Sequence, residues 1–168
     1  TIIKAKPGDI NDPQGPTALV VSRGGKIFAE GTKDKPIIFT AEEDDVNDPN
    51  DLDFDDKGLW GGIIILGNAV INVPDGEEPI EGIPSNEVRG IYGGQDDNDN
   101  SGVMKYVSIR HGGVNIGGDN NEINGLTLGG VGSGTELDYI EVWSNLDDGI
   151  EFFGGTVGIK HALVAFCG

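Results

Sequence analysis

Arg110, Asp148 and Glu151 are the residues of this sequence that are most suited to acid–base chemistry. Two carboxylates on opposite sides of a glycosidic bond are what glycoside hydrolysis requires, and Asp148 and Glu151 lie in one short stretch. Arg110 follows the apolar stretch 106–109, where alternation places Ser108 and Arg110 on the outer face. The structural alternative is that the aspartates accept backbone N–H groups at a turn.

Two acidic segments, 42–56 and 96–100, carry the oxygen ligands that calcium prefers. The candidate ligands are Asp53, Asp55, Asp96, Asp97 and Asp99. Clustered carboxylates repel one another, so an ordered loop of this density requires a cation. Neither segment has the ligand order of an EF-hand. Two interpretations therefore stay open, a calcium site and a solvated acidic loop.

Other chemistry finds less support. Trp60, Tyr92 and Trp143 are candidates for stacking on sugar rings if they are exposed. His161 is interpreted as a core or ladder residue rather than a ligand. No serine lies in a Gly-x-Ser-x-Gly sequence, which argues against a hydrolase nucleophile of that type. The single cysteine, Cys167, follows apolar residues and cannot form an internal disulfide.

Charge and hydropathy exclude several classes of partner. The 168 residues include 29 acidic and 11 basic side chains, for a net charge of −18. This charge opposes binding to nucleic acid and to anionic membrane surfaces. No apolar run approaches the roughly 18 residues of a membrane span. We therefore expect no nucleic-acid partner and no membrane insertion.

Short strands must position these residues, because helical periodicity is almost absent. Val107, Ile140 and Leu163 are interpreted as equivalent strand centres, and Leu126 and Phe152 as a second, interleaved series. This spacing predicts a coil with more than one strand per turn and roughly 20–30 residues per turn. Each strand would then pair in parallel with its equivalent on the next turn.

Glycine pairs mark the corners of this coil. Gly accepts positive φ without strain, and Asn is the next best residue for that conformation. The pairs stand at positions 24–25, 61–62, 93–94, 112–113, 117–118, 129–130 and 154–155. We expect Asn68, Asn115, Asn124 and Asn145 to occupy similar corners.

The chain is expected to be one all-β domain over residues 1–168. Polar, turn-rich stretches predict inserted loops at about 41–57, 74–94 and 95–101. Apolar strands open and close the sequence, so we expect a fragment of a longer protein. The coil would continue, or meet other chains, at both ends.

The sequence resembles the right-handed parallel β-helix proteins of the pectate-lyase-like superfamily. The similarity lies in residues 24–32, 36–40, 58–67, 107–113, 121–132 and 147–155. The last three stretches resemble, more narrowly, secreted surface proteins of Bacteroidetes type. The resemblance implies a right-handed parallel β-helix in a secreted or cell-surface protein.

The resemblance leaves two functions open. The first is a non-catalytic scaffold for adhesion or glycan binding, whose partner is a polysaccharide or another surface or matrix component, with calcium as a stabilising ion. The alternative is a carbohydrate-active enzyme, a polysaccharide lyase or glycoside hydrolase. In β-helix lyases an arginine base and calcium act together, which would give Arg110 a role beside Glu151 and Asp148. An enzyme would gather these residues on one flank, whereas a scaffold would leave them on different faces.

Overall fold

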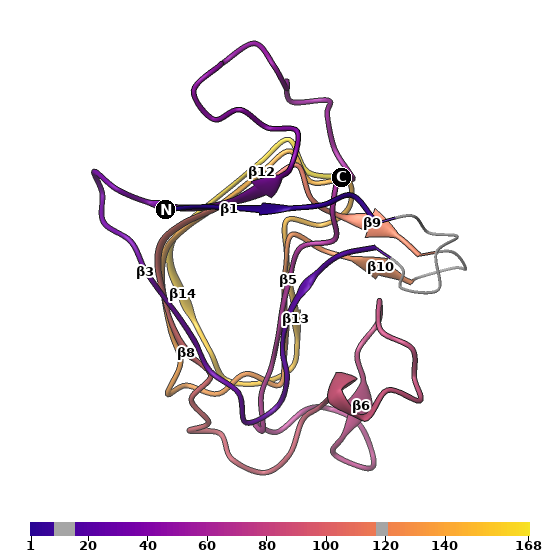
Figure 1. The fold of residues 1–168 in the computed structure, drawn as a ribbon. Coiled ribbons are helices and arrows are strands. Elements are labelled where there is room, and N and C mark those ends of the chain that lie inside the picture. The colour runs from indigo at the N-terminus through magenta and orange to yellow at the C-terminus, as the bar shows by residue number, and fades with distance from the viewer. Residues whose placement is uncertain (9–15, 117–120) are drawn as a thin grey trace.

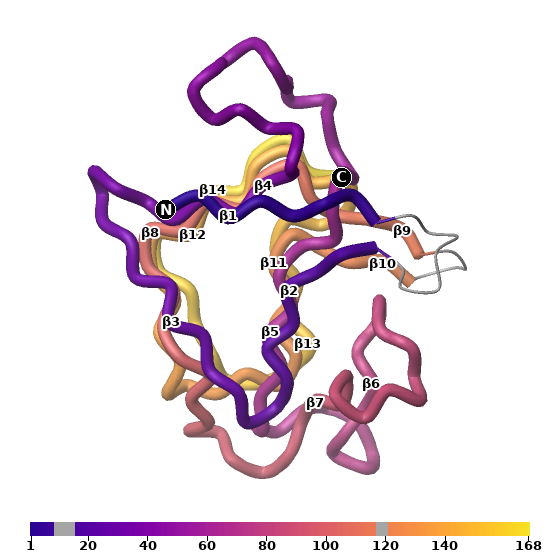
Figure 2. Tube along the Cα trace, viewed as in Figure 1, coloured from indigo at the N-terminus to yellow at the C-terminus, as the bar shows by residue number. Residues whose placement is uncertain are grey.

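The strands of the two large sheets run parallel and stack in successive turns of a coil, seen along its axis in Figures 1 and 2. The computed structural model describes residues 1–8, 16–116 and 121–168. Within these residues the helical structure is limited to the 3-10 turn η1 (Val88–Gly90), and no helix is long and apolar enough to cross a membrane. The prediction of an all-β parallel coil is confirmed.

Two parallel sheets form the coil. The six-stranded sheet has the order β1 (Ile2–Ala5), β4 (Ile37–Ala41), β8 (Gly102–Arg110), β12 (Glu136–Trp143) and β14 (Ile159–Ala165), with β3 (Ile27–Glu30) also paired to β8. The four-stranded sheet has the order β13 (Ile150–Phe153), β11 (Leu126–Gly129), β5 (Ile63–Leu66) and β2 (Leu19–Val21). Two short antiparallel pairs complete the strands: β6 (Glu78–Pro79) with β7 (Ile91–Tyr92), and β9 (Val114–Asn115) with β10 (Glu122–Ile123).

The six-stranded sheet bends sharply at one residue in each of three turns. Tyr106, Tyr139 and His161 have φ between 48° and 53°, in the left-handed region that side chains rarely adopt. Before the bend β8 pairs with β3, and after it β8 pairs with β4. The sheet therefore supplies two of the three walls of the coil, and the four-stranded sheet supplies the third.

The three bend residues stack their rings in a ladder along the outside. The Tyr106 and Tyr139 centroids are 4.4 Å apart, and those of Tyr139 and His161 are 4.2 Å apart. His161 Nδ1 also lies 2.7 Å from Asp138 Oδ1. Ring stacking offsets part of the cost of the left-handed backbone. The interpretation of His161 as a ladder residue is confirmed.

Glycine pairs do form corners, as predicted. In each of the six pairs that the structure describes, at least one glycine has positive φ; Gly117 and Gly118 lie outside the described residues. Of the four named asparagines, Asn68, Asn124 and Asn145 lie between strands and Asn115 lies in β9, but none of them has the expected positive φ. A second row of left-handed corners uses His111, Ser144 and Phe166 instead.

The core fills the space between the walls. Its centre consists of fully buried apolar side chains from both sheets, among them Ile63, Ile65, Val107, Ile109, Leu126, Leu128, Ile140 and Val142. The predicted equivalence of Val107 and Ile140 is correct, but the partner of Ile140 in β14 is Ala162. Leu163 is one residue further along, so it faces outward beside Glu141 and is half exposed.

A second apolar cluster lies outside the coil, on the four-stranded sheet. Ile64 and Leu66 point outward and are buried under the segment 71–94, which contributes Ile71, Ile80 and Tyr92. Figure 1 shows this segment, with β6, beside the outer side of β5 and β13. The segment is therefore held to the wall by apolar contacts.

Leu128→Ala tests the importance of the coil interior. We expect the substitution to lower the free energy of unfolding by about 2–5 kcal/mol, because it leaves a cavity at a fully buried site. Chemical denaturation measures the effect. Val88→Ala is the control: Val88 is 80% exposed, so its loss is expected to change stability by less than about 0.5 kcal/mol. Equal effects would contradict the assigned core.

Candidate functional site

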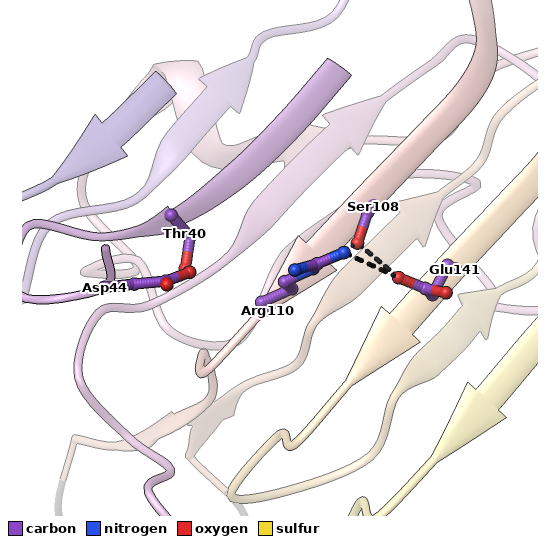
Figure 3. Close-up of polar contacts among 5 residues, drawn as sticks. All are labelled: Thr40, Asp44, Ser108, Arg110 and Glu141. Atoms are coloured by element: carbon purple, nitrogen blue, oxygen red, sulfur yellow. Dashed lines mark hydrogen bonds and ion pairs between the residues drawn. The ribbon is translucent and has the colours of Figure 1, made fainter. Parts of the chain in front are cut away.

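A network of polar side chains lies on the outer face of the six-stranded sheet, across β8 and β12 (Figure 3). Arg110 Nε donates to Ser108 Oγ at 2.8 Å, and Ser108 Oγ donates to Glu141 Oε1 at 2.5 Å. Arg110 Nη2 is 3.4 Å from the same Glu141 oxygen. Ser108 and Glu141 are register partners on neighbouring strands, so the sheet itself fixes this geometry. Arg110 therefore faces outward, as predicted, but its charge is balanced by Glu141.

Aromatic side chains continue this outer face. Trp143 is the register partner of Arg110 and meets Phe166 edge-on, with centroids 4.6 Å apart. Phe54 reaches Phe166 from the other side at 5.1 Å, and both phenylalanines are nearly half exposed. By contrast, Trp60 and Tyr92 are buried, so the expectation that they could stack on sugars is wrong. Trp143 is the member of that set that remains at the surface.

The 41–57 loop stands beside the polar network and carries Phe54; it is the purple loop at the top of Figure 1. Its base is fixed by Thr40 Oγ1, which donates to Asp44 Oδ2 at 2.5 Å with both residues buried (Figure 3). Asp53 Oδ1 accepts the N–H of Asp55 at 2.8 Å. A turn of this kind, in which an aspartate accepts a backbone N–H two residues ahead, gives the loop a defined path.

The carboxylates of the second acidic segment, 96–100, also accept hydrogen bonds from the protein. Asp96 accepts the N–H of Asn98 at 3.0 Å, and Asp97 accepts the N–H of Val70 at 3.1 Å. Asp99 is buried and accepts from Ser101 Oγ at 3.1 Å. The segment is therefore bound to the coil through backbone and hydroxyl donors.

These acidic segments do not assemble a cluster of metal ligands. No three His, Cys, Asp or Glu side chains come close enough to hold a metal ion within residues 1–8, 16–116 and 121–168. The observed hydrogen bonds already occupy Asp53, Asp96, Asp97 and Asp99. Calcium binding by Asp53, Asp55, Asp96, Asp97 and Asp99 stays a prediction.

Glu151 belongs to a different wall from Arg110. It lies on β13 of the four-stranded sheet, whereas Arg110 lies on β8 of the six-stranded sheet. Asp148 lies at the corner before β13, where its carbonyl accepts from Gly125 N–H and from Asn145 Nδ2. The predicted group of Arg110, Asp148 and Glu151 is thus divided between two walls of the coil.

Glu151 instead faces Glu81, a residue that sequence reasoning missed. Asn124 Nδ2 donates to Glu151 Oε2 at 2.6 Å and to Glu81 Oε1 at 3.1 Å. Burial and the neighbouring Glu151 carboxylate raise the pKa of Glu81 from 4.5 to about 7. Burial, followed by the nearby Glu78, also raises the pKa of Tyr92. No sequence pattern links positions 81 and 151, because the segment 71–94 brings Glu81 back onto the wall.

The stacked parallel walls and projecting loops agree with a family match over residues 2–167, to the pectate-lyase-like β-helix domain. The chain belongs to this family. No curated protein and no solved structure matches the sequence significantly. As a pectate-lyase-like β-helix domain, the chain fits an extracellular role connected with polysaccharides. The family match does not distinguish binding from catalysis.

Glu81 gives the stability a specific pH dependence. Folded Glu81 keeps its proton to about pH 7, while unfolded Glu81 loses it near 4.5, so the free energy of unfolding falls as pH rises through this window. Glu81→Gln has no proton to lose, and its stability is expected to fall less between these limits. Thermal melts of both proteins across the window, with chelator present, measure the difference. A difference that stays constant with pH would contradict the raised pKa.

Proposed function

We propose that this chain is part of a secreted or cell-surface scaffold that binds glycans without catalysis. Its binding surface is the outer face of the six-stranded sheet beside the 41–57 loop. The observation that carries the proposal is the row formed by the half-exposed Phe54 and Phe166 and the partly buried Trp143, next to the network of Ser108, Arg110 and Glu141. Apolar ring faces pack against the C–H faces of sugars, while nearby polar groups bind their hydroxyls.

The rigidity of the coil supports this role. Trp143 and Arg110 are register partners on paired strands, so their spacing is fixed by backbone hydrogen bonds. A preorganised surface loses little conformational entropy when it binds a ligand. The wall also presents its side chains in rows along the stacked turns, which suits an extended polymer.

Electrostatics favour a neutral glycan over a polyanionic one. The chain carries a net charge of −18, which repels polyuronates. On this face Arg110 already pairs with Glu141, and Lys4 on β1 donates to the carbonyl of Glu42. A neutral polysaccharide avoids the repulsion and can still use the amide, hydroxyl and guanidinium groups of the wall.

A carbohydrate-active enzyme is the alternative that the family match also fits. Lyase chemistry on a uronate would require Arg110 as a base, and its side chain is held by Ser108 and Glu141. A joint role for Arg110 and Glu151 would require two walls of the coil to act on one substrate. Both observations support the binding role over the enzyme.

Trp143→Ala is expected to weaken binding to a neutral extracellular polysaccharide by about tenfold or more, because a central aromatic contact is lost. Affinity electrophoresis against a panel of neutral and uronate-rich polysaccharides measures the effect. Phe28→Ala is the matched control: Phe28 is 69% exposed, but it lies on β3, in the wall before the bend, whereas the 41–57 loop follows β4 in the wall after it. Equal loss in both variants, or no retardation of the wild type by any neutral glycan, would refute the surface.

The same panel separates binding from catalysis. We expect no new reducing ends and no unsaturated uronate ends after prolonged incubation, with or without calcium. Release of either product, abolished by Arg110→Lys or Glu151→Gln, would establish the enzyme instead.

A further inference from the structure

Four oxygen-bearing side chains belong to the outer side of the four-stranded sheet and to the segment 71–94 that covers it, away from the proposed glycan surface. Glu151 on β13 and Thr127 on β11 are register partners on the outer side of the sheet. Glu81 comes from the covering segment, and Asn124 lies just before β11, where its amide contacts both carboxylates. The group therefore joins the segment to the wall.

Negative charge at this point has no basic partner. The negative charge of Glu122 also acts on Glu81, and the negative charge of Glu78 acts on the neighbouring Tyr92. The ion pairs found among the described residues involve Glu77, Glu87, Glu136, Asp138 and Glu141. None of them reaches Glu81 or Glu151. Two carboxylates held against one amide in a half-buried position need either a shared proton or a positive counter-charge.

Two buried oxygens beside the carboxylates lack a hydrogen-bond partner. Asn124 is fully buried and its Oδ1 accepts no hydrogen bond, while its Nδ2 lies against Glu81 and Glu151. Thr127 is 1% exposed, and its Oγ1 has no partner either. Buried polar atoms are normally satisfied, so both oxygens point to a further ligand. This observation is independent of the acidic charge.

We propose that Glu81, Glu151, Asn124 and Thr127 form a binding site for a divalent cation, with calcium as the preferred ion. The ligands are all hard oxygen donors: two carboxylates, one amide oxygen and one hydroxyl. Rotation of the Asn124 amide by half a turn places Oδ1 on the side of the two carboxylates. Calcium accepts water for its remaining positions, and the site has a route to solvent.

That route lies at Glu81, which is the one proposed ligand that lines an open hollow of about 450 Å³, together with Ile80, Ile83 and Ile116. Because Glu81 belongs to the segment and Glu151 to the sheet, a bound ion links the two. The site therefore fastens the segment 71–94 onto the coil. It is separate from the acidic segments 42–56 and 96–100, which use other residues.

Calcium titration of the chelator-treated chain tests the proposal. Calcium is expected to raise the melting temperature of the wild type by about 5 °C at saturation, because it binds the folded state alone. The double variant Glu81→Gln/Glu151→Gln keeps the shape of both side chains and is expected to lose the shift. Asp53→Asn/Asp55→Asn is the matched control with the same change of charge, and it is expected to keep the shift.

Terbium luminescence supplies a second, local readout. Terbium replaces calcium at oxygen sites and is excited through a nearby tyrosine, so Tyr92→Phe is expected to reduce the emission severalfold. If the double glutamine variant does not fold, Thr127→Val removes one ligand at constant shape and is expected to weaken calcium binding. No calcium shift in the wild type, an equal shift in the double variant, or loss of the shift in the Asp53/Asp55 control would each overturn the proposal.

Discussion

The stacking of each turn on the next in constant register is the constraint on which the rest of this structure depends. Ile63, Leu126 and Ile150 occupy one row, and Val107, Ile140 and Ala162 occupy another. Parallel hydrogen bonding sets these rows, and a slip of one residue would turn an apolar row toward solvent. Every inward and outward position of the walls follows from this register.

The register also fixes where polar side chains can act. Because the interior takes the apolar rows, Arg110, Glu141 and Trp143 form rows on the outside of one wall, and Thr127 and Glu151 form a row on another. The long excursions leave the coil between its strands, so they do not disturb the pairing within the walls. Each excursion then covers a different wall, which gives the chain two chemically distinct surfaces.

Local patterns in the sequence predict the coil and the direction of its side chains well. Gly pairs predict the corners, and alternation around Val107 and Ile109 places Arg110 outside. The positions of individual side chains that depend on tertiary contacts cannot be predicted from such patterns. The equivalent of Val107 and Ile140 is Ala162, the residue directly after the bend at His161, and not the larger Leu163.

Local sequence patterns also do not predict the long-range contacts. Glu81 and Glu151 are far apart in the sequence, and only the folded segment 71–94 brings them together. The burial of Trp60 and Tyr92 likewise depends on what covers them, which their residue types do not determine. Asn124 and Asn145 lie between strands without the left-handed conformation, and their side-chain amides donate to neighbouring groups.

The ladder of Tyr106, Tyr139 and His161 has a spectroscopic consequence. The two phenol rings are 4.4 Å apart and within 6° of parallel, so their electronic transitions couple. Coupled transitions of this kind give a near-ultraviolet circular dichroism band that disappears when the rings separate. Because Tyr106 and Tyr139 belong to successive turns, the intensity of this band reports whether those two turns remain stacked.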